Sequence, residues 1–293
     1  MNQTTLLLNL LTDGVTTGAL YALVAIGFSL LWWLSDLIHL AHGAVVIAAG
    51  YAGYTAIAVL GLPFWVGIFL AALLAIVLGM LIQQFAYQNM IKKGAGEMGL
   101  LTISLGVLIS LEYIIVLIYG PEGVRLDAFA LRAPIFPGSG YILDAFSLIV
   151  IGSVLVIFVA LHYFIKYSDT GKRMRAVAAN VELAQVLGIS TWKVTMIVAA
   201  LSAALVAPAS FVYLHDRGLE PHDAMHIVIM ASIVAIVGGR GSLSGAVVAG
   251  LIVGVAESIM VWFFAAGWRE IMTFALLYIV LLFKPEGLFG ESR

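Results

Sequence analysis

The chain of 293 residues is 63% hydrophobic and only 10% charged, and its mean hydropathy is +1.11. Soluble domains carry about 25% charged residues, so this composition excludes an ordinary soluble protein and indicates an integral membrane protein. Cysteine is absent, which excludes disulfides, cysteine nucleophiles and thiolate metal sites. The formal net charge of −2 is uninformative about partners, and we expect no nucleic-acid partner.

Apolar runs of about 20 residues, the length that crosses a bilayer as a helix, recur along the whole chain. They lack the ten-residue alternation of a β-barrel, so residues 1–293 are predicted to form one all-α domain, a polytopic membrane helix bundle of about eight or nine spans. Because the first run has a full span's length and no Lys or Arg before it, we expect no cleavable signal. The expected spans are Leu8–Trp33, a second from the polar break Ser35–Gly43 to Leu60, a third from the Gly61–Pro63 turn to Met90, Leu100–Tyr119, Ala145–Ile165, Trp192–Tyr213, Met225–Val237, a helix from a glycine-rich break to Ala265, and Ile271–Phe283.

Two of these helices carry small residues along one face, which lets helices approach closely in a membrane. The faces are Gly14, Gly18, Tyr21 and Ala25 in the first span, and Gly250, Gly254, Glu257 and Val261 in the penultimate one. We predict close helix packing on both faces.

The stretch Met225–Val237 is short for a span, because its length as a helix is only about 20 Å against a hydrocarbon core of about 30 Å. It is either a short buried span or a half-helix. The break from Gly238 to Gly245 that follows it makes a glycine-broken helix pair. The break could present backbone amides to an anion, or it could serve close packing, and the sequence leaves both open.

The familiar catalytic motifs are missing or out of context. Gly94–Gly99 spells a dinucleotide fingerprint by letter, but it follows a lysine-bearing membrane turn, so we interpret it as a loop. The phosphate-loop pattern is absent, so any ATP drive comes from another subunit. Ser242 and Ser244 lack a nucleophile elbow and an activating His or Asp, so serine hydrolysis is not expected. The sequence therefore carries no motif that indicates an enzyme, and we expect no bound cofactor.

One long polar segment, Asp169–Ser190, interrupts the apolar chain. Lys172, Arg173 and Arg175 would each cost several kcal/mol at the bilayer centre, so the segment belongs in water on the cytoplasmic side. Asp169 or Thr170 can cap a helix start and Gly188 can end it. We predict one short helix along the membrane surface, suited to docking a partner.

The basic residues indicate an orientation. If every expected segment crosses, ten of the fourteen Lys and Arg residues, Lys92 and Lys93 among them, lie on one side of the membrane, and four lie on the other. The positive-inside rule then predicts an outside N-terminus and a cytoplasmic C-terminus. The four outside residues are Arg125, Arg132, Arg217 and Arg269.

Ionisable residues inside the spans are candidate functional groups. Glu112 and Glu257 lie in apolar helices, where a carboxyl group either lines a pathway or makes a structural hydrogen bond, and both readings stay open. Asp36, His39 and His42 are three apart and would share a helix face, and paired imidazoles can bind a divalent metal. Polar capping and interhelical hydrogen bonds at the membrane boundary are the favoured explanation, and no metal is expected.

Five motifs occur together in one order. They are Gly18-Ala19-Leu20-Tyr21-Ala22-Leu23, Ala41-His42-Gly43, Arg175-Ala176-Val177-Ala178 with Ala184-x-x-x-Gly188, Gly238-Gly239-x-Gly241-Ser242-x-x-Gly245-Ala246, and Lys284-Pro285-x-Gly287-Leu288-Phe289-Gly290. On these motifs the chain resembles, over nearly its full length, the branched-chain amino-acid permease family of ABC importers, and most closely the shorter of its two permease types. It departs from the pattern at His39, where the family usually has Asn, at Leu40 in a Phe position, and at Leu183 in place of a second alanine.

The resemblance implies a multi-pass subunit of a bacterial-type cytoplasmic (inner) membrane. It implies a second permease subunit, either a longer paralogue or an identical copy, two cytoplasmic ATPase subunits that bind ATP and Mg, and an extracytoplasmic substrate-binding protein. Residues 169–190 would form the coupling helix, with ATPase-coupling roles for Arg173, Arg175, Glu182, Ala184 and Gly188. The residues we assign to the translocation path are Tyr21, His39, His42, Glu112, Gly238, Gly239, Gly241, Ser242 and Glu257.

The solute stays open at this point. Branched-chain or related amino acids are the first expectation, and permeases for urea, short amides or aromatic and organic acids share the same signatures. An ion-coupled secondary transporter that uses Glu112 or Glu257 as a relay is the alternative from another class. An intramembrane enzyme would need a competent nucleophile or metal.

Overall fold

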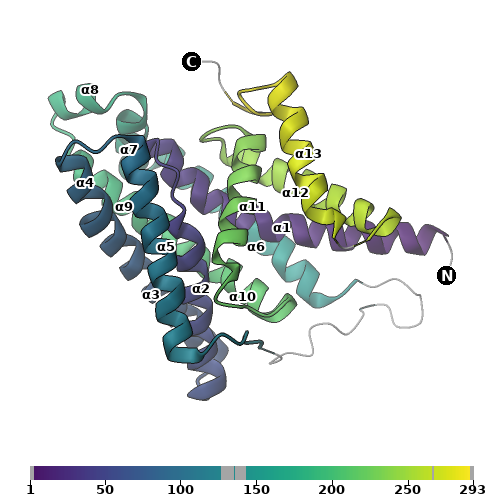
Figure 1. Cartoon of the computed structure of the whole chain (residues 1–293). Helices are drawn as coiled ribbons and strands as arrows, with labels where there is room; N and C mark the ends of the chain where they lie inside the picture. Colours follow the sequence, from purple (N-terminus) through teal and green to yellow (C-terminus); the bar gives the residue numbers. More distant parts are fainter. Residues whose placement is uncertain (1–2, 127–134, 136–142, 266, 291–293) are drawn as a thin grey trace. The chain divides into compact units, whose positions relative to one another are not determined.

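The computed structural model describes residues 3–126, 135, 143–265 and 267–290, and within these ranges helices joined by turns and loops make up the protein, with an isolated bridge between Val124 and Leu219 (Figure 1). The helices are α1 (Gln3–Ser35), α2 (Ala41–Tyr54), α3 (Phe64–Leu81), α4 (Gln88–Lys92), α5 (Glu97–Tyr119), α6 (Ala145–Tyr167), α7 (Asp169–Ala179), α8 (Val181–Val186), α9 (Thr191–Ala204), α10 (Val206–Asp216), α11 (Asp223–Gly238), α12 (Leu243–Phe263) and α13 (Trp268–Phe283), with π-helices η1 (Thr55–Val59) and η2 (Ile82–Tyr87). The predicted loop from Gly120 to Gly140 falls mostly outside the described residues.

Seven helical segments in the described part of the chain are long and apolar enough to cross a membrane. They are Thr5–Ser35, Ala41–Val59, Phe64–Lys92, Glu97–Tyr119, Ala145–Tyr167, Thr191–Asp216 and Leu243–Phe263. The prediction of an all-α, polytopic membrane protein is therefore confirmed.

The difference from eight or nine spans lies in α11 and α13, which have 16 residues each. A helix of that length covers about 24 Å, less than the hydrocarbon core of about 30 Å. Helix α11 is longer than the predicted Met225–Val237, because it begins at Asp223 and ends at Gly238.

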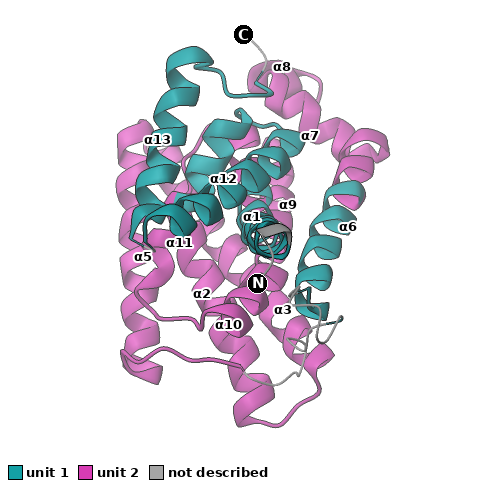
Figure 2. Cartoon of the chain, turned by 90° about the vertical axis from the view of Figure 1, so that its right-hand side faces the viewer, with its two compact units in different colours: residues 1–26, 127–159, 230–293 teal, residues 27–126, 160–229 magenta. Residues whose placement is uncertain are grey.

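The chain folds into two compact units, coloured teal and magenta in Figure 2. Unit 1 comprises Met1–Ile26, Asp127–Val159 and Met230–Arg293, and unit 2 comprises Gly27–Leu126 and Ala160–Ile229. Since α1, α6 and α11 each pass from one unit to the other, the two units are interleaved along the sequence.

Unit 2 is built around α2, which packs against α3, α5 and α10. Glycines let its neighbours come close. A Cβ on Gly43 would lie 2.0 Å from the Ala224 carbonyl oxygen of α11, and one on Gly53 would lie 2.4 Å from the Phe211 ring of α10. The Ala41-His42-Gly43 motif therefore has a packing role, because only glycine permits the approach to Ala224.

Unit 1 contains a close crossing of α1 and α12. A Cβ on Gly18 would lie 2.6 Å from the Gly250 carbonyl oxygen, and one on Gly254 would lie 2.2 Å from the Gly18 nitrogen. The predicted close packing of both small-residue faces is confirmed, and the structure adds that the two faces pack on each other.

The structure refines two local predictions. The expected span Trp192–Tyr213 consists of two helices that meet at Leu205, because Pro208 lacks the N–H that a continuous helix needs. Gly94–Gly99 is not wholly a loop, since α5 begins at Glu97.

Candidate functional site

Residues of unit 2 form a buried chain of hydrogen bonds that joins the start of α2 to η2 and α5. His39 Nδ1 lies 2.5 Å from the Tyr87 hydroxyl, which lies 2.7 Å from the Ser104 hydroxyl. Ser104 in turn accepts a hydrogen bond of 3.0 Å from the backbone nitrogen of Ala41. This satisfies one of the backbone N–H groups that a helix start leaves without an intrahelical partner. The bond from His39 joins the loop before α2 to η2, so it supports the favoured explanation of polar hydrogen bonding for the histidines, although His39 itself is not helical.

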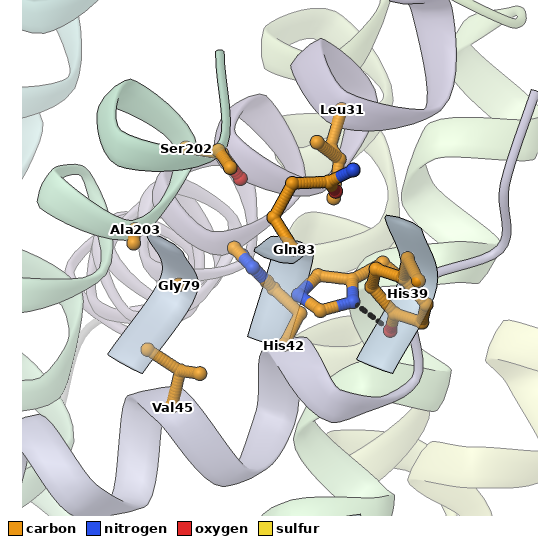
Figure 3. Close-up of a pocket in the computed structure, with 10 residues that line it drawn as sticks. Leu31, His39, His42, Val45, Gly79, Gln83, Ser202 and Ala203 are labelled. Atoms are coloured by element: carbon orange, nitrogen blue, oxygen red, sulfur yellow. Dashed lines mark hydrogen bonds between the residues drawn. The ribbon is translucent and has the colours of Figure 1, made fainter. Parts of the chain in front are cut away.

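The two histidines line a small cavity with Gln83 (Figure 3). Their ring centroids are 5.7 Å apart, and both residues are buried. Among the described residues, the Oε1 atom of buried Gln83 has no hydrogen-bond partner. The cavity has a volume of about 10 Å³, which is about the space that one water molecule needs. A cavity of this volume is too small to hold an organic solute.

Asp36 does not join the histidines, which corrects the prediction of a shared helix face. Residues 36–39 are not helical, since they lie between the end of α1 and the start of α2 at Ala41. Asp36 is exposed and has a φ of 55°. In the described ranges no group of three His, Asp or Glu side chains is placed to hold a metal ion. Burial, and then the neighbouring His42, lower the pKa of His39, which lies between the first two spans. The imidazole is therefore neutral and suited to hydrogen bonding.

Glu257 is the centre of a second buried cluster, in unit 1. The carboxylate is fully buried and accepts hydrogen bonds from the Tyr21 hydroxyl, at 2.9 Å, and from the Thr273 hydroxyl. The Arg269 Nε lies 3.9 Å from the same carboxylate. A buried carboxylate is tolerated when it is hydrogen-bonded and paired with a cation. These contacts link α1, α12 and α13 through the Glu257 carboxylate.

Glu112 is paired as well. Its carboxylate lies 2.5 Å from His222 Nδ1, and the two side chains are 12% and 52% exposed. His222 lies in the loop before α11, so the pair ties α5 to that loop. This contact supports the structural interpretation of Glu112, because His222 is a hydrogen-bond partner for its carboxylate.

The C-terminal Lys284–Gly290 motif packs against the glycine-rich break that follows α11, within unit 1. Gly239, Gly241 and Gly287 have positive φ angles. The backbone nitrogens of Leu288 and Phe289 donate to the carbonyl oxygens of Val237 and Gly238, at 2.8 and 3.0 Å. The close-packing alternative thus has direct support, because the two C-terminal motifs are partners.

Ser242 has a capping role at the start of α12. Its hydroxyl accepts a hydrogen bond of 3.0 Å from the Gly245 nitrogen. A Cβ on Gly245 would lie 2.1 Å from the Gly238 carbonyl oxygen, so the ends of α11 and α12 approach closely. The hydroxyl of Ser242 therefore serves the helix start.

The polar segment Asp169–Ser190 forms two helices, α7 and α8, and not the single helix predicted. Asn180 ends α7 and caps α8, where its side chain accepts a hydrogen bond of 2.8 Å from the Leu183 nitrogen. The first cap is Ser168, not Asp169 or Thr170. A hydrogen bond from Lys172 lowers the pKa of exposed Asp169. The predicted stop is confirmed, since Gly188 follows the end of α8 with a φ of 79°.

The predicted coupling residues differ in their surroundings. Arg175 donates hydrogen bonds to the carbonyl oxygens of Ile165 and Lys166, so it caps the end of α6. Ala184 is buried, whereas Arg173 and Glu182 are exposed.

Sequence reasoning missed several residues of both clusters, namely Gln83, Tyr87, Ser104, Arg269 and Thr273. Gln83 and Tyr87 lie in η2, and π-helical turns often occur at functional positions. A polar Gln-Gln pair inside an apolar span was the available signal for this region.

The architecture is that of a polytopic helical membrane protein, with buried polar clusters and a polar helical segment outside its candidate spans. The model of the family described as "Branched-chain amino acid transport system / permease component" matches residues 10–281, and the chain belongs to this family. It is thus a permease subunit of a multi-subunit ABC transporter, not itself catalytic, and the resemblance inferred from the five motifs is confirmed.

Curated relatives match nearly end to end. The high-affinity branched-chain amino acid transport system permease protein LivH of Salmonella typhimurium is 30% identical over 96% of this chain and 94% of the relative. BraD of Pseudomonas aeruginosa, described in the same words, is 28% identical over 97% and 95%. Both are of the shorter permease type.

Among solved structures, PsaBC from Streptococcus pneumoniae in complex with Fab is similar in fold. It has a TM-score of 0.51 at 15% identity and covers 94% of this chain and 92% of that one.

Proposed function

We propose that this chain is the membrane-spanning permease subunit of a binding-protein-dependent importer for branched-chain or related amino acids. The observation that carries this proposal is the family match over residues 10–281, together with relatives that are described as high-affinity branched-chain amino acid permeases. In this proposal the complete transporter also contains a second permease, two ATPase subunits with ATP and Mg, and an extracytoplasmic binding protein.

The proposed topology has an outside N-terminus and a cytoplasmic C-terminus in an inner membrane. With α11 and α13 counted as short spans, nine crossings place the polar helices α7 and α8 on the cytoplasmic side. The Lys and Arg distribution supports this arrangement, because ten of the fourteen basic residues then lie inside.

The exposed apolar side chains of α8 support a docking role for this segment. Leu183, Val186 and Leu187 are 57%, 82% and 69% exposed. They follow exposed Glu182 in a segment that lies outside the candidate spans. Contiguous exposed apolar side chains on a water-facing segment mark a protein contact, and here the occupant we propose is the ATPase subunit.

Movement of the docked ATPase would reach the membrane through α7 and α6. Arg175 holds the last carbonyl groups of α6. A Cβ on Gly171 would lie 2.3 Å from the Ile165 carbonyl oxygen, so α7 is packed directly against this helix end. A displacement of α7 is therefore passed to α6 without a flexible linker, which suits alternating access.

The coupling role is tested by comparing two identical changes at exposed leucines. Leu187→Ser removes a docking side chain, whereas Leu60→Ser changes a leucine that is 63% exposed after the second span. Leu187→Ser is expected to reduce ATPase capture and solute uptake in proteoliposomes, and Leu60→Ser is expected to leave both unchanged. Equal capture and uptake by the two variants would contradict the docking role.

The solute is tested with the complete complex in proteoliposomes. ATP-dependent accumulation of leucine, isoleucine or valine is expected, with urea and benzoate as comparison solutes. Accumulation of urea or benzoate in place of these amino acids would overturn the solute assignment.

A further inference from the structure

Unit 2 contains a second, much larger cavity at the ends of α5 and α10 and the start of α11, which we call the charged pocket. Its volume is about 530 Å³, within the range of about 300–1,000 Å³ that is usual for small-molecule sites. The pocket is lined by Glu122, Gly123, Val124, Arg125, Tyr213, Arg217, Gly218, Leu219, Glu220, Asp223, His226 and Ile227. In the proposed topology this end of unit 2 lies on the extracytoplasmic side of the membrane, where the solute arrives.

The pocket is held in shape by hydrogen bonds between its two loops. Val124 and Leu219 exchange backbone hydrogen bonds of 3.0 and 2.8 Å. The buried Tyr51 hydroxyl donates to the carbonyl oxygens of Glu122 and Leu219, at 3.3 and 3.2 Å. Asp223 accepts a hydrogen bond of 2.9 Å from the Glu220 nitrogen, which fixes one of its carboxylate oxygens. The site is therefore formed before any ligand arrives.

The lining combines a buried floor with charges of both signs. Tyr213, Leu219 and Ile227 are at most 4% exposed and make the floor. Arg125 and Arg217 contribute guanidinium groups that can hold a carboxylate by paired hydrogen bonds. Glu122, Glu220 and Asp223 contribute carboxylates that can hold an ammonium group.

We infer that the charged pocket binds a free α-amino acid, with Arg125 and Arg217 toward its carboxylate, Asp223 and Glu220 toward its ammonium group, and its side chain on the Tyr213 and Ile227 floor. The inference rests on the proposed function and adds a residue-level site to it. Mixed charge favours a zwitterion, because a zwitterion pairs with both sets of charges. An organic acid or an amine pairs with one set and leaves the other unpaired, and urea carries no charge for either set.

The test uses the assembled complex without its binding protein, so that binding to the pocket is seen directly. Saturation-transfer NMR with leucine, leucinamide and 4-methylpentanoate compares a zwitterion with analogues that lack the carboxylate or the ammonium group. Leucine is expected to bind about tenfold more tightly than either analogue, because each analogue lacks one charge-assisted contact and loses the affinity that this contact contributes.

Each variant should remove one preference and leave the other. Arg217→Gln should abolish the preference for leucine over leucinamide, and Asp223→Asn should abolish the preference for leucine over 4-methylpentanoate. Arg125→Gln repeats the first test, because Arg217 also lies 3.5 Å from Asp216. Glu270→Gln, a change at an exposed carboxylate of α13 in unit 1, should alter neither preference.

Two results would overturn the pocket: leucine fails to bind the unaltered complex, or the variants keep both preferences. Uptake by the complete complex, measured in parallel, separates this from the proposed function. Uptake of branched-chain amino acids without binding at the pocket would overturn the pocket alone. Binding with the expected preferences but without such uptake would overturn the proposed function alone.

Discussion

Gly254→Ala should separate α1 from α12 and destabilise the protein. The added Cβ would lie 2.2 Å from the Gly18 nitrogen, 2.4 Å from the Gly14 carbonyl oxygen and 2.4 Å from the Gly18 Cα. Ordinary contact begins near 3.4 Å, so the helices would have to part by about 1 Å. Because all three atoms belong to the backbone, no side-chain rotation can relieve the clash. Overpacking of this kind costs about 1–3 kcal/mol.

Gly106→Ala is the matched control for this prediction. Gly106 lies inside α5, and a Cβ built there meets nothing within 4 Å. Alanine favours a helix by about 0.8–1.0 kcal/mol over glycine, so this variant should be as stable as the unaltered protein or slightly more stable. Thermal denaturation in detergent, followed by size-exclusion recovery, measures the difference. If Gly254→Ala and Gly106→Ala denature at the same temperature, the inferred helix contact is wrong.

Three further predictions concern the buried networks. Tyr21→Phe removes a donor from buried Glu257 and should cost about 1–3 kcal/mol of stability; an unchanged denaturation temperature would argue against the bond. Gly287→Ala places a Cβ 2.4 Å from the Gly239 Cα at a φ of 83°, so it should increase hydrogen exchange at the end of α11, whereas Gly267→Ala, which meets nothing within 4 Å, should not. Tyr87→Phe breaks both hydroxyl contacts of the buried chain and should lower solute uptake at unchanged ATPase capture; normal uptake would show that the chain is dispensable.

The small-residue periodicity of the sequence predicted which helix faces pack closely, but not which face meets which. Gly18 and Gly250 are far apart in the chain, and a helical repeat reports only the surface that one helix presents. The placement of Tyr21 against Glu257 depends on the same pairing of α1 with α12. Their bond therefore could not be inferred from either helix alone.

The interior of the third span was missed for a different reason. Gln83 and Tyr87 reach the histidine cluster from a π-helical turn, which offsets side chains from the ordinary repeat. No residue pattern marks such a turn. By contrast, the break at Asn180 had a readable signal, because Asn favours helix caps over helix interiors.

The glycine-rich break and the Lys284–Gly290 motif are separate in the sequence but in contact in the structure. Helix α11 ends at Gly238, which leaves carbonyl groups without intrahelical partners. The nitrogens of Leu288 and Phe289 satisfy two of them. The positive φ angles of Gly239 and Gly287 permit the approach that these bonds require. The two motifs therefore stabilise each other's conformation through these backbone contacts.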